Sequence, residues 1–182
     1  AKAHPNPAHY ALSQLQKMGH LTDIITQNID YLHQKAGSKK VWEFHGTLKT
    51  FTCTNCMTTY DWGPKLEKNG KPECKECHGL LKPDFVFFGE GIPQDAQIAA
   101  EKAIQKTDLL LIVGTTGEIM PASLLPFQAK QRGATIIEIN PAKSQYTDRI
   151  SDIYIKGKAG EILPKIVQSL KHILNRGMNK KN

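Results

Sequence analysis

Four cysteines in two pairs constrain the fold of this chain more than any other feature. They form Cys53-x-x-Cys56 and Cys74-x-x-Cys77, separated by 17 residues, and the sequence has no other cysteine. Two such knuckles can bring four thiolates into a tetrahedral cage, the geometry of a structural Zn²⁺ site that leaves no position for substrate. We therefore predict one Zn²⁺ that stabilises a small lobe and takes no part in the chemistry.

Disulfide bonds and redox chemistry are the alternatives for these cysteines. No N-terminal signal peptide is visible, so we expect a cytoplasmic protein with reduced thiols. A redox site would need one Cys-x-x-Cys pair, and this chain has two matched pairs. His78 directly follows Cys77, but four thiolates complete the cage, so we expect His78 to lie at the surface.

Composition limits the classes of function. The chain has 182 residues, of which 40% are hydrophobic and 23% charged, which suits one globular domain with a small inserted lobe. No apolar run reaches about 18 residues, so we expect no membrane-spanning segment and no membrane partner. The net charge is +7, but the lysines are scattered and those near the cysteines are balanced by acids, so we expect no direct nucleic-acid partner.

Buried strands and helices alternate along the chain. Short apolar runs predict strands at 21–26, 41–44, 85–88, 108–113, 134–139 and 153–155. Periodic apolar residues predict helices at 7–18, 30–35, 96–104, 121–131 and 159–174. This order predicts an α/β fold with a Rossmann-like, doubly wound parallel sheet. We assign residues 1–47 and 82–182 to that domain, and residues 48–81 to an inserted zinc lobe with a hairpin turn at Asn69-Gly70.

Four polar or glycine-bearing segments follow the predicted strands. They are residues 27–30, 45–46 and 114–116 and the single residue Asn140. Ligands of doubly wound sheets bind outside the carboxyl ends of the strands, so we expect these segments to contribute to one site. One part of a dinucleotide site is missing, because the sequence contains no Gly-x-Gly-x-x-Gly cradle for a pyrophosphate.

Several of these segments match the pattern of one enzyme family. They are Thr26-Gln27-Asn28-Ile29-Asp30, Phe44-His45-Gly46, the paired Cys-x-x-Cys motif, residues 82–90, Gly114-Thr115-Thr116, Asn140-Pro141 and Lys158-Ala159. In this order they resemble the sirtuins, the NAD-dependent protein lysine deacylases. The resemblance implies an enzyme that removes acyl groups such as acetyl from protein lysines, transfers them to ADP-ribose and releases nicotinamide.

The resemblance also implies roles for residues of this sequence. His45 would be the general base that accepts a proton from the attacking ribose hydroxyl of NAD, a task that suits an imidazole near neutral pH. The residues around NAD would be Gln27, Asn28 and Asp30 near the nicotinamide ribose, Gly114, Thr115, Thr116 and Asn140 at the adenosine ribose, and Ala159 at the adenine. The walls of the acyl-lysine cleft would be Val86, Phe88, Gly89 and Glu90 on one side and Gly117, Glu118 and Ile119 on the other. The substrate peptide would add between these walls as a β-strand.

Two departures from the family pattern keep a second interpretation open. The family usually has Gly-Thr-Ser where this chain has Gly114-Thr115-Thr116, which keeps the hydroxyl but crowds the ribose. The family's N-terminal Gly-Ala-Gly phosphate loop and Asp-Phe-Arg segment do not occur, so the first βα unit of the predicted domain would be absent. The chain is then expected to be an N-terminally truncated sirtuin. The alternative function is a catalytically incomplete fragment that only binds nucleotide or acyl-peptide.

Overall fold

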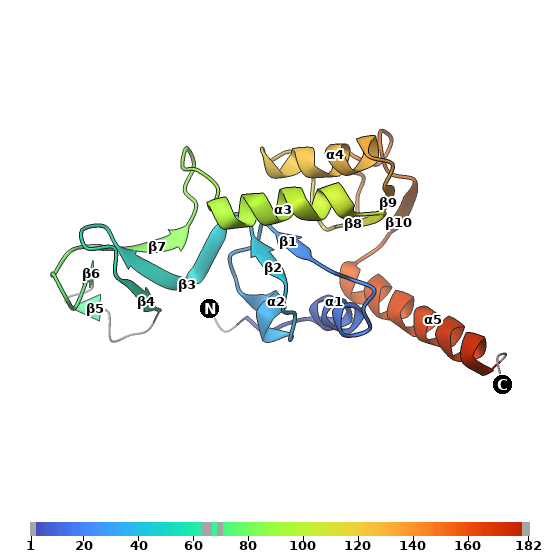
Figure 1. The fold of residues 1–182 in the computed structure, drawn as a ribbon, viewed down its shortest axis with the longest axis horizontal. Helices are drawn as coiled ribbons and strands as arrows, with labels where there is room; N and C mark the ends of the chain where they lie inside the picture. Colours follow the sequence, from blue (N-terminus) through green and yellow to red (C-terminus); the bar gives the residue numbers. More distant parts are fainter. Residues whose placement is uncertain (1–2, 63–66, 69–70, 180–182) are drawn as a thin grey trace. The chain divides into compact units, whose positions relative to one another are not determined.

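The computed structural model describes residues 3–62, 67–68 and 71–179 (Figure 1). The helices are α1 (Pro7–Lys17), α2 (Leu32–Lys35), α3 (Gln94–Lys106), the 3₁₀ helix η2 (Ala122–Leu124), α4 (Leu125–Gln131) and α5 (Ala159–Asn179). The strands are β1 (Ile24–Thr26), β2 (Val41–Glu43), β3 (Gly46–Cys53), β4 (Thr59–Asp61), β5 (Glu67–Lys68), β6 (Lys71–Pro72), β7 (Leu81–Phe85), β8 (Leu109–Val113), β9 (Thr135–Asn140) and β10 (Ile153–Lys156).

The chain divides into two compact units, and each is described by itself. Unit 1 comprises Ala1–Ile24, Leu32–Val41 and Ile98–Asn182. Unit 2 comprises Ile25–Tyr31 and Trp42–Gln97, and the lobe predicted at residues 48–81 lies within it. Two of the four points where the chain passes from one unit to the other lie in the short strands β1 and β2, which pair with each other.

Unit 1 is built on a parallel sheet with the strand order β10-β9-β8. Leu109 of β8 pairs with Thr135 of β9, and Ile153 of β10 pairs with Ile137. One hydrophobic cluster joins this sheet to α1 and α5, and its buried members are Ala8, Ala11, Leu12, Leu15, Ile24, Ile139, Leu163 and Val167. Since side chains alternate along a strand, Ile139 turns to this cluster, and Glu138 and Asn140 turn to the opposite face.

Local sequence explains where α1 begins. The side chain of Asn6 accepts hydrogen bonds from the backbone N–H groups of Ala8 and His9, and Pro7 occupies the first turn. The His9 side chain in turn accepts from the Asn6 backbone N–H, which completes a capping box. The helix predicted at residues 7–18 is therefore confirmed to within one residue at its end.

The amphipathic helix α5 is longer than predicted. Its apolar stripe buries Leu163 and Val167, and the helix continues past Leu174 to Asn179. In its last turns Ile173 is 67% exposed, so the core contacts are made by the first half. None of the helices in the described part of the chain combines the length and the apolar character needed to cross a membrane.

Unit 2 contains an antiparallel sheet with the strand order β4-β3-β7 (Figure 1). A small cluster of Phe51, Cys53, Cys74 and Leu81 is buried against it. The ring of Trp62 stacks on Phe51 with a centroid separation of 4.6 Å. The strands β5 and β6 pair as a hairpin, and the turn predicted at Asn69-Gly70 lies outside the described residues.

The strand predicted at residues 85–88 is wrong, because β7 ends at Phe85. After the N–H of Val86 donates to the carbonyl of His45 at 2.9 Å, the chain leaves the sheet. The carboxylate of Glu90 then accepts the backbone N–H of Phe87 at 3.0 Å and pairs with the Lys82 ammonium at 2.9 Å. These short-range bonds fold residues 87–90 into a turn that leaves Phe88 fully exposed, despite its preference for strands.

Gly46, the first residue of β3, permits a very close approach of two backbone segments in unit 2. Its φ is +71°, and a Cβ at this position would lie 2.1 Å from the carbonyl oxygen of Asp84. The position therefore excludes a side chain on two grounds, backbone strain and collision with a backbone that cannot rotate away.

We expect Gly46→Ala to lower the free energy of unfolding of unit 2 by roughly 3 kcal/mol or more, the sum of left-handed strain and overpacking. Urea denaturation followed by tryptophan fluorescence measures this directly, because both tryptophans, Trp42 and Trp62, belong to unit 2. Gly89→Ala is the control, since Gly89 has a φ of +89° but a Cβ there meets open space. Equal losses in the two variants would contradict the close contact.

Candidate functional site

Unit 2 contains a cavity of about 460 Å³ at the ends of its strands. The residues that line it are Gln27, Asn28, Ile29, Asp30, His45, Phe85 and Val86. Five of these were predicted from the sequence, namely Gln27, Asn28, Asp30, His45 and Val86. Polar groups from two distant segments therefore converge on one concave surface, as expected of a ligand site.

Backbone hydrogen bonds bring these segments together. The N–H of Phe44 donates to the carbonyl of Thr26 at 2.8 Å, which ties the end of β2 to the end of β1. The N–H of Leu48 donates to the carbonyl of Ile29 at 3.0 Å, and the N–H of Asn28 to the hydroxyl of Thr26 at 3.1 Å. These bonds fix the turn that carries Asn28 and Asp30 beside the residue that precedes β3.

His45 lies between β2 and β3, immediately before Gly46. Its carbonyl accepts the N–H of Val86, and its imidazole is half-buried in the cavity. The close packing of Gly46 against Asp84 and Phe85 holds this peptide against the end of β7. An imidazole in this position can accept a proton from a ligand in the cavity.

Not all of the residues predicted for the substrate wall reach this cavity. Val86 lines it, but Phe88, Gly89 and Glu90 belong to the exposed turn after β7 and are absent from the lining. The N–H of Phe87 and the ammonium of Lys82 hold the pKa of the Glu90 carboxyl below its usual value, so Glu90 is a charged anchor of that turn.

Two lining residues, Ile29 and Phe85, were not singled out from the sequence. Ile29 lies between Asn28 and Asp30, in a segment that the sequence analysis recognised. Its position in that segment could therefore have predicted that it lines the cavity. Phe85 was assigned to a strand that should have continued to residue 88. Its ring lies 4.5 Å from the ring of Phe87, and only the early end of β7 places it at the cavity.

Unit 1 brings together the predicted residues at the ends of β8 and β9. The N–H of Gly114 donates to the carbonyl of Ile139 at 3.1 Å, and the side-chain amide of Asn140 donates to the carbonyl of Thr115 at 2.7 Å. The hydroxyl of Thr116 donates to the Glu118 carboxylate at 3.3 Å. Of the four predicted nucleotide-binding residues, Gly114, Thr115 and Thr116 thus form a turn after β8, and Asn140 at the end of β9 is hydrogen-bonded to that turn.

The other predicted residues of unit 1 flank this turn. Ala159 begins α5, just after Gly157, whose N–H donates to the carbonyl of Asn140 at 3.1 Å. Gly117 and Glu118 line a second cavity of about 540 Å³, together with residues of η2, α4 and the chain around Arg149. Ile119 is 49% exposed and does not line that cavity.

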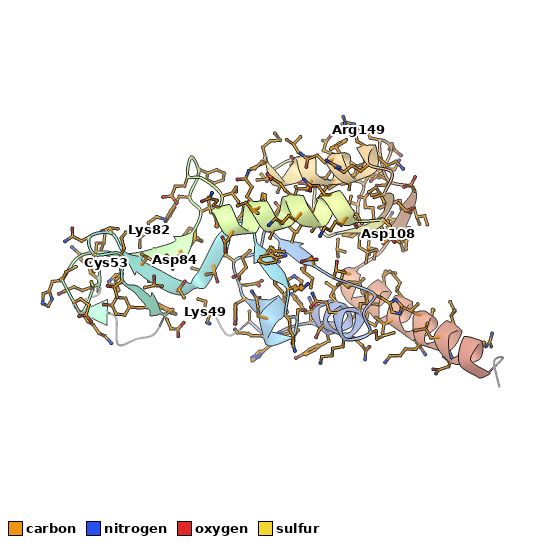
Figure 2. The ribbon with its side chains drawn as sticks, in the orientation of Figure 1. Lys49, Cys53, Lys82, Asp84, Asp108 and Arg149 are labelled. Carbon is orange, nitrogen blue, oxygen red and sulfur yellow. The ribbon has the colours of Figure 1, made fainter. Side chains whose placement is uncertain are left out.

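The four cysteines of unit 2 fit a tetrahedral metal site. Their sulfur atoms all lie within 4.8 Å of one another, with 3.5 Å between Cys53 and Cys77 and between Cys56 and Cys74. Four sulfurs around one Zn²⁺ with Zn–S bonds of about 2.3 Å would be about 3.8 Å apart, so small shifts suffice for binding. Figure 2 labels Cys53 in this lobe, together with Asp84 of β7, whose carboxylate accepts from the Thr50 hydroxyl at 2.6 Å.

The pKa values of the cysteine thiols are also consistent with a site for a cation. A hydrogen bond from Tyr60 lowers the pKa of the Cys74 thiol to about 6. The Gly79 N–H lowers the pKa of the Cys77 thiol, but the neighbouring sulfurs of Cys56 and Cys53 outweigh it and raise that pKa to about 12. Without a cation Cys77 therefore remains a neutral thiol, and a divalent cation would allow all four sulfurs to be thiolates.

His78 lies outside the sulfur cage, as expected. Its Nδ1 contacts the carboxylate of Glu73 at 2.6 Å, and its side chain is 72% exposed. It occupies a left-handed turn with a φ of +59°, which Met57 matches in the first knuckle with a φ of +60°. The two knuckles therefore share one backbone conformation.

Comparison with known proteins identifies the family of this chain. Residues 1–121 match the Sir2 family. The chain belongs to the Sir2 family. It is 45% identical over 172 residues to NAD-dependent protein deacetylase 1 of Pyrobaculum aerophilum. The matched region covers 93% of this chain and 67% of that protein.

Solved structures of Sir2 proteins share this fold. A Sir2 homologue in complex with NAD superposes with a TM-score of 0.90 at 38% identity, over 95% of this chain and 67% of that one. Sir2Af2 bound to a myristoylated histone peptide superposes with a TM-score of 0.86 at 42% identity, over 96% of this chain and 75% of that one. These likenesses confirm the predicted sirtuin resemblance and the predicted Rossmann-like α/β fold class.

We expect metal analysis of this Sir2 protein to find about one Zn²⁺ per chain, and Cys74→Ser to abolish tight binding because three thiolates leave the cage open. His78→Ala is the matched control and should retain the metal, since His78 bonds to Glu73. Removal of the metal by a chelator should also change the fluorescence of Trp62, which stacks beside the cage. A zinc content far below one per chain would contradict the site.

Proposed function

We propose that this Sir2 protein uses NAD to remove acyl groups from lysine side chains of proteins. The acyl group, such as acetyl, is transferred to ADP-ribose and nicotinamide is released. The observation that carries the proposal is the convergence of His45, Asn28 and Asp30 on one cavity of unit 2, in a chain of the Sir2 family. The Pyrobaculum relative is an NAD-dependent protein deacetylase, which supports the same chemistry here.

Two groups of residues, each within a single unit, are proposed to contact NAD. Gln27, Asn28 and Asp30 bind near the nicotinamide ribose, where amide and carboxylate oxygens accept hydroxyl protons. Thr115, Thr116 and Asn140 contact the adenosine ribose, Gly114 allows the turn that carries them, and Ala159 lies at the adenine. The NAD complex of a Sir2 homologue with the same fold supports this assignment.

His45 is the general base in this proposal. When bound, NAD supplies the ribose hydroxyl that attacks the acyl carbon. The imidazole of His45 accepts the proton of that hydroxyl on a ring nitrogen, as a neutral histidine can near pH 7. Asn28 and Asp30 orient the hydroxyl, and the apolar walls made by Ile29, Phe85 and Val86 limit the access of water.

The protein partner is an acyl-lysine peptide in an extended conformation. The residues proposed for its binding are Val86, Phe88, Gly89 and Glu90 after β7, and Gly117, Glu118 and Ile119 after the nucleotide-binding turn. In this proposal the extended peptide lies against the exposed turn at residues 87–90. The complex of Sir2Af2 with a myristoylated histone peptide supports this class of partner.

Zn²⁺ on Cys53, Cys56, Cys74 and Cys77 has a structural role in this proposal. Four thiolates leave no position for substrate, so the metal stabilises the lobe and the chemistry stays at His45. Thiolates that must remain reduced to bind zinc favour a reducing compartment, and we propose a cytoplasmic location on that ground.

We expect NAD-dependent removal of acetyl from an acetyl-lysine peptide, measured by mass spectrometry together with nicotinamide release. His45→Ala should lower the rate about 10²- to 10⁴-fold, the usual contribution of a positioned base. His20→Ala is the control, because His20 is exposed and belongs to unit 1. An unchanged rate for His45→Ala would remove His45 from the mechanism, and binding of NAD without turnover by the unsubstituted protein would favour the non-catalytic alternative.

A further inference from the structure

Glu138 is a fully buried carboxylate in the middle of β9. One carboxylate oxygen accepts the hydroxyl of Ser144 at 2.6 Å, and the other accepts the hydroxyl of Ser151 at 2.8 Å. Burial raises the pKa of Glu138, but hydrogen bonds from Ser144, Ser151, Thr147 and Asn140 outweigh it and lower the pKa below its usual value. Glu138 is therefore ionised at neutral pH, which is costly in a protein interior unless the charge is well bonded.

The carboxylate fastens both ends of the loop formed by residues 141–151. Ser144 lies near the start of this loop and Ser151 at its end, so one acidic side chain closes it. The hydroxyl of Ser144 also accepts the N–H of Tyr146 at 3.1 Å, and the N–H of Ser144 donates to the hydroxyl of Thr147 at 2.9 Å. Arg149, labelled in Figure 2, places its guanidinium 4.8 Å from the ring centre of Phe127 on α4.

The loop at residues 141–151 also fixes the conformation of the turn at residues 114–117. The N–H of Gln145 donates to the carbonyl of Thr116 at 3.0 Å. The buried ring of Tyr146 packs on Gly117 so closely that a Cβ there would lie 2.7 Å from it. The Tyr146 hydroxyl donates to the carbonyl of Ser123 at 3.2 Å, which fixes the ring in that position.

Glu138 also contributes to the orientation of Asn140, together with the Thr115 carbonyl. The two residues are two positions apart on β9 and so face the same side of the sheet. A carboxylate can only accept hydrogen bonds, so it attracts the NH₂ end of the Asn140 amide, the same end that donates to Thr115. With the NH₂ end engaged by the protein, we infer that Oδ1 of Asn140 is left to accept from a ligand hydroxyl.

We propose that Glu138 is a positioning residue for the nucleotide, acting through Asn140 and through the loop at residues 141–151. Its carboxylate sets both the amide orientation of Asn140 and the conformation of the Thr115–Gly117 backbone, and it does so from a buried position without contact with the nucleotide. The inference rests on the proposed function, in which this turn binds the adenosine ribose.

The test is Glu138→Gln, which keeps the shape but replaces one accepting oxygen by a donating NH₂. One serine hydroxyl then loses its acceptor, and the amide of Asn140 keeps the Thr115 carbonyl but loses its charged acceptor. We expect the dissociation constant for NAD, measured by calorimetry, and the KM for NAD each to rise about tenfold, the usual effect of losing a hydrogen bond to a charged group. The kcat at saturating NAD should stay within about twofold, because His45 is untouched.

The matched control is Asp148→Asn, which removes an exposed carboxylate of the same loop that pairs with Lys143 at 2.9 Å. It should leave the affinity for NAD unchanged. Hydrogen exchange of the Gln145 amide adds a readout that needs no ligand, and it should accelerate in Glu138→Gln but not in Asp148→Asn. A folded Glu138→Gln protein with unchanged NAD affinity would overturn the inference.

Ser144→Ala keeps the inference testable if Glu138→Gln does not fold. It removes a hydroxyl that both donates to Glu138 and accepts from Tyr146, so NAD affinity should fall several-fold. Ser151→Ala removes only one donor and should have the smaller effect. NAD binding by Ser144→Ala as tight as by Asp148→Asn would overturn the role of Glu138 alone. Failure of the unsubstituted protein to bind NAD would instead overturn the proposed function.

Discussion

Backbone hydrogen bonding between segments that are distant in the sequence is the constraint on which both candidate sites depend. In unit 1, the parallel pairing of β8 with β9 puts Gly114 beside Ile139 and brings Asn140 to Thr115. In unit 2, the approach of Gly46 to the end of β7 fixes His45 against Val86. Each polar side chain is therefore positioned by the strand end that carries it, which limits the orientational freedom lost on binding a ligand.

The zinc lobe solves a different problem, the small size of its core. Among the described residues of the lobe, Phe51 and Leu81 are the buried apolar side chains that pack beside Cys53 and Cys74, and so few groups contribute little burial energy. Four sulfurs at close range repel one another as thiolates, and a bound cation converts that repulsion into attraction. Because β3 carries Cys53 at one end and Gly46 at the other, the strand that the metal stabilises also begins beside His45.

Glu138 is a second case in which a charge that is unfavourable alone is stabilised by its surroundings, here in unit 1. An ionised carboxylate in a sheet interior is unfavourable unless donors surround it, and here they come from the loop that contacts residues 116 and 117. The sequence predicted a buried strand at residues 134–139, and Glu138 within it was not singled out. Such exceptions to local pattern often mark functional or strained positions.

The sequence by itself determined the fold class, the paired cysteine knuckles and the polar turns after the strands. These features depend on the spacing and periodicity of residues that are close together in the chain, and such patterns can be read without coordinates. It also indicated five of the seven residues that meet in the cavity of unit 2. Only the tertiary structure decided that β7 ends at Phe85, that Phe85 lines the cavity, and that Tyr146 packs on Gly117. These features depend on bonds such as Lys82–Glu90 and Glu138–Ser151. The strength of such bonds depends on three-dimensional geometry, and no repeating sequence pattern indicates which side chains will pair.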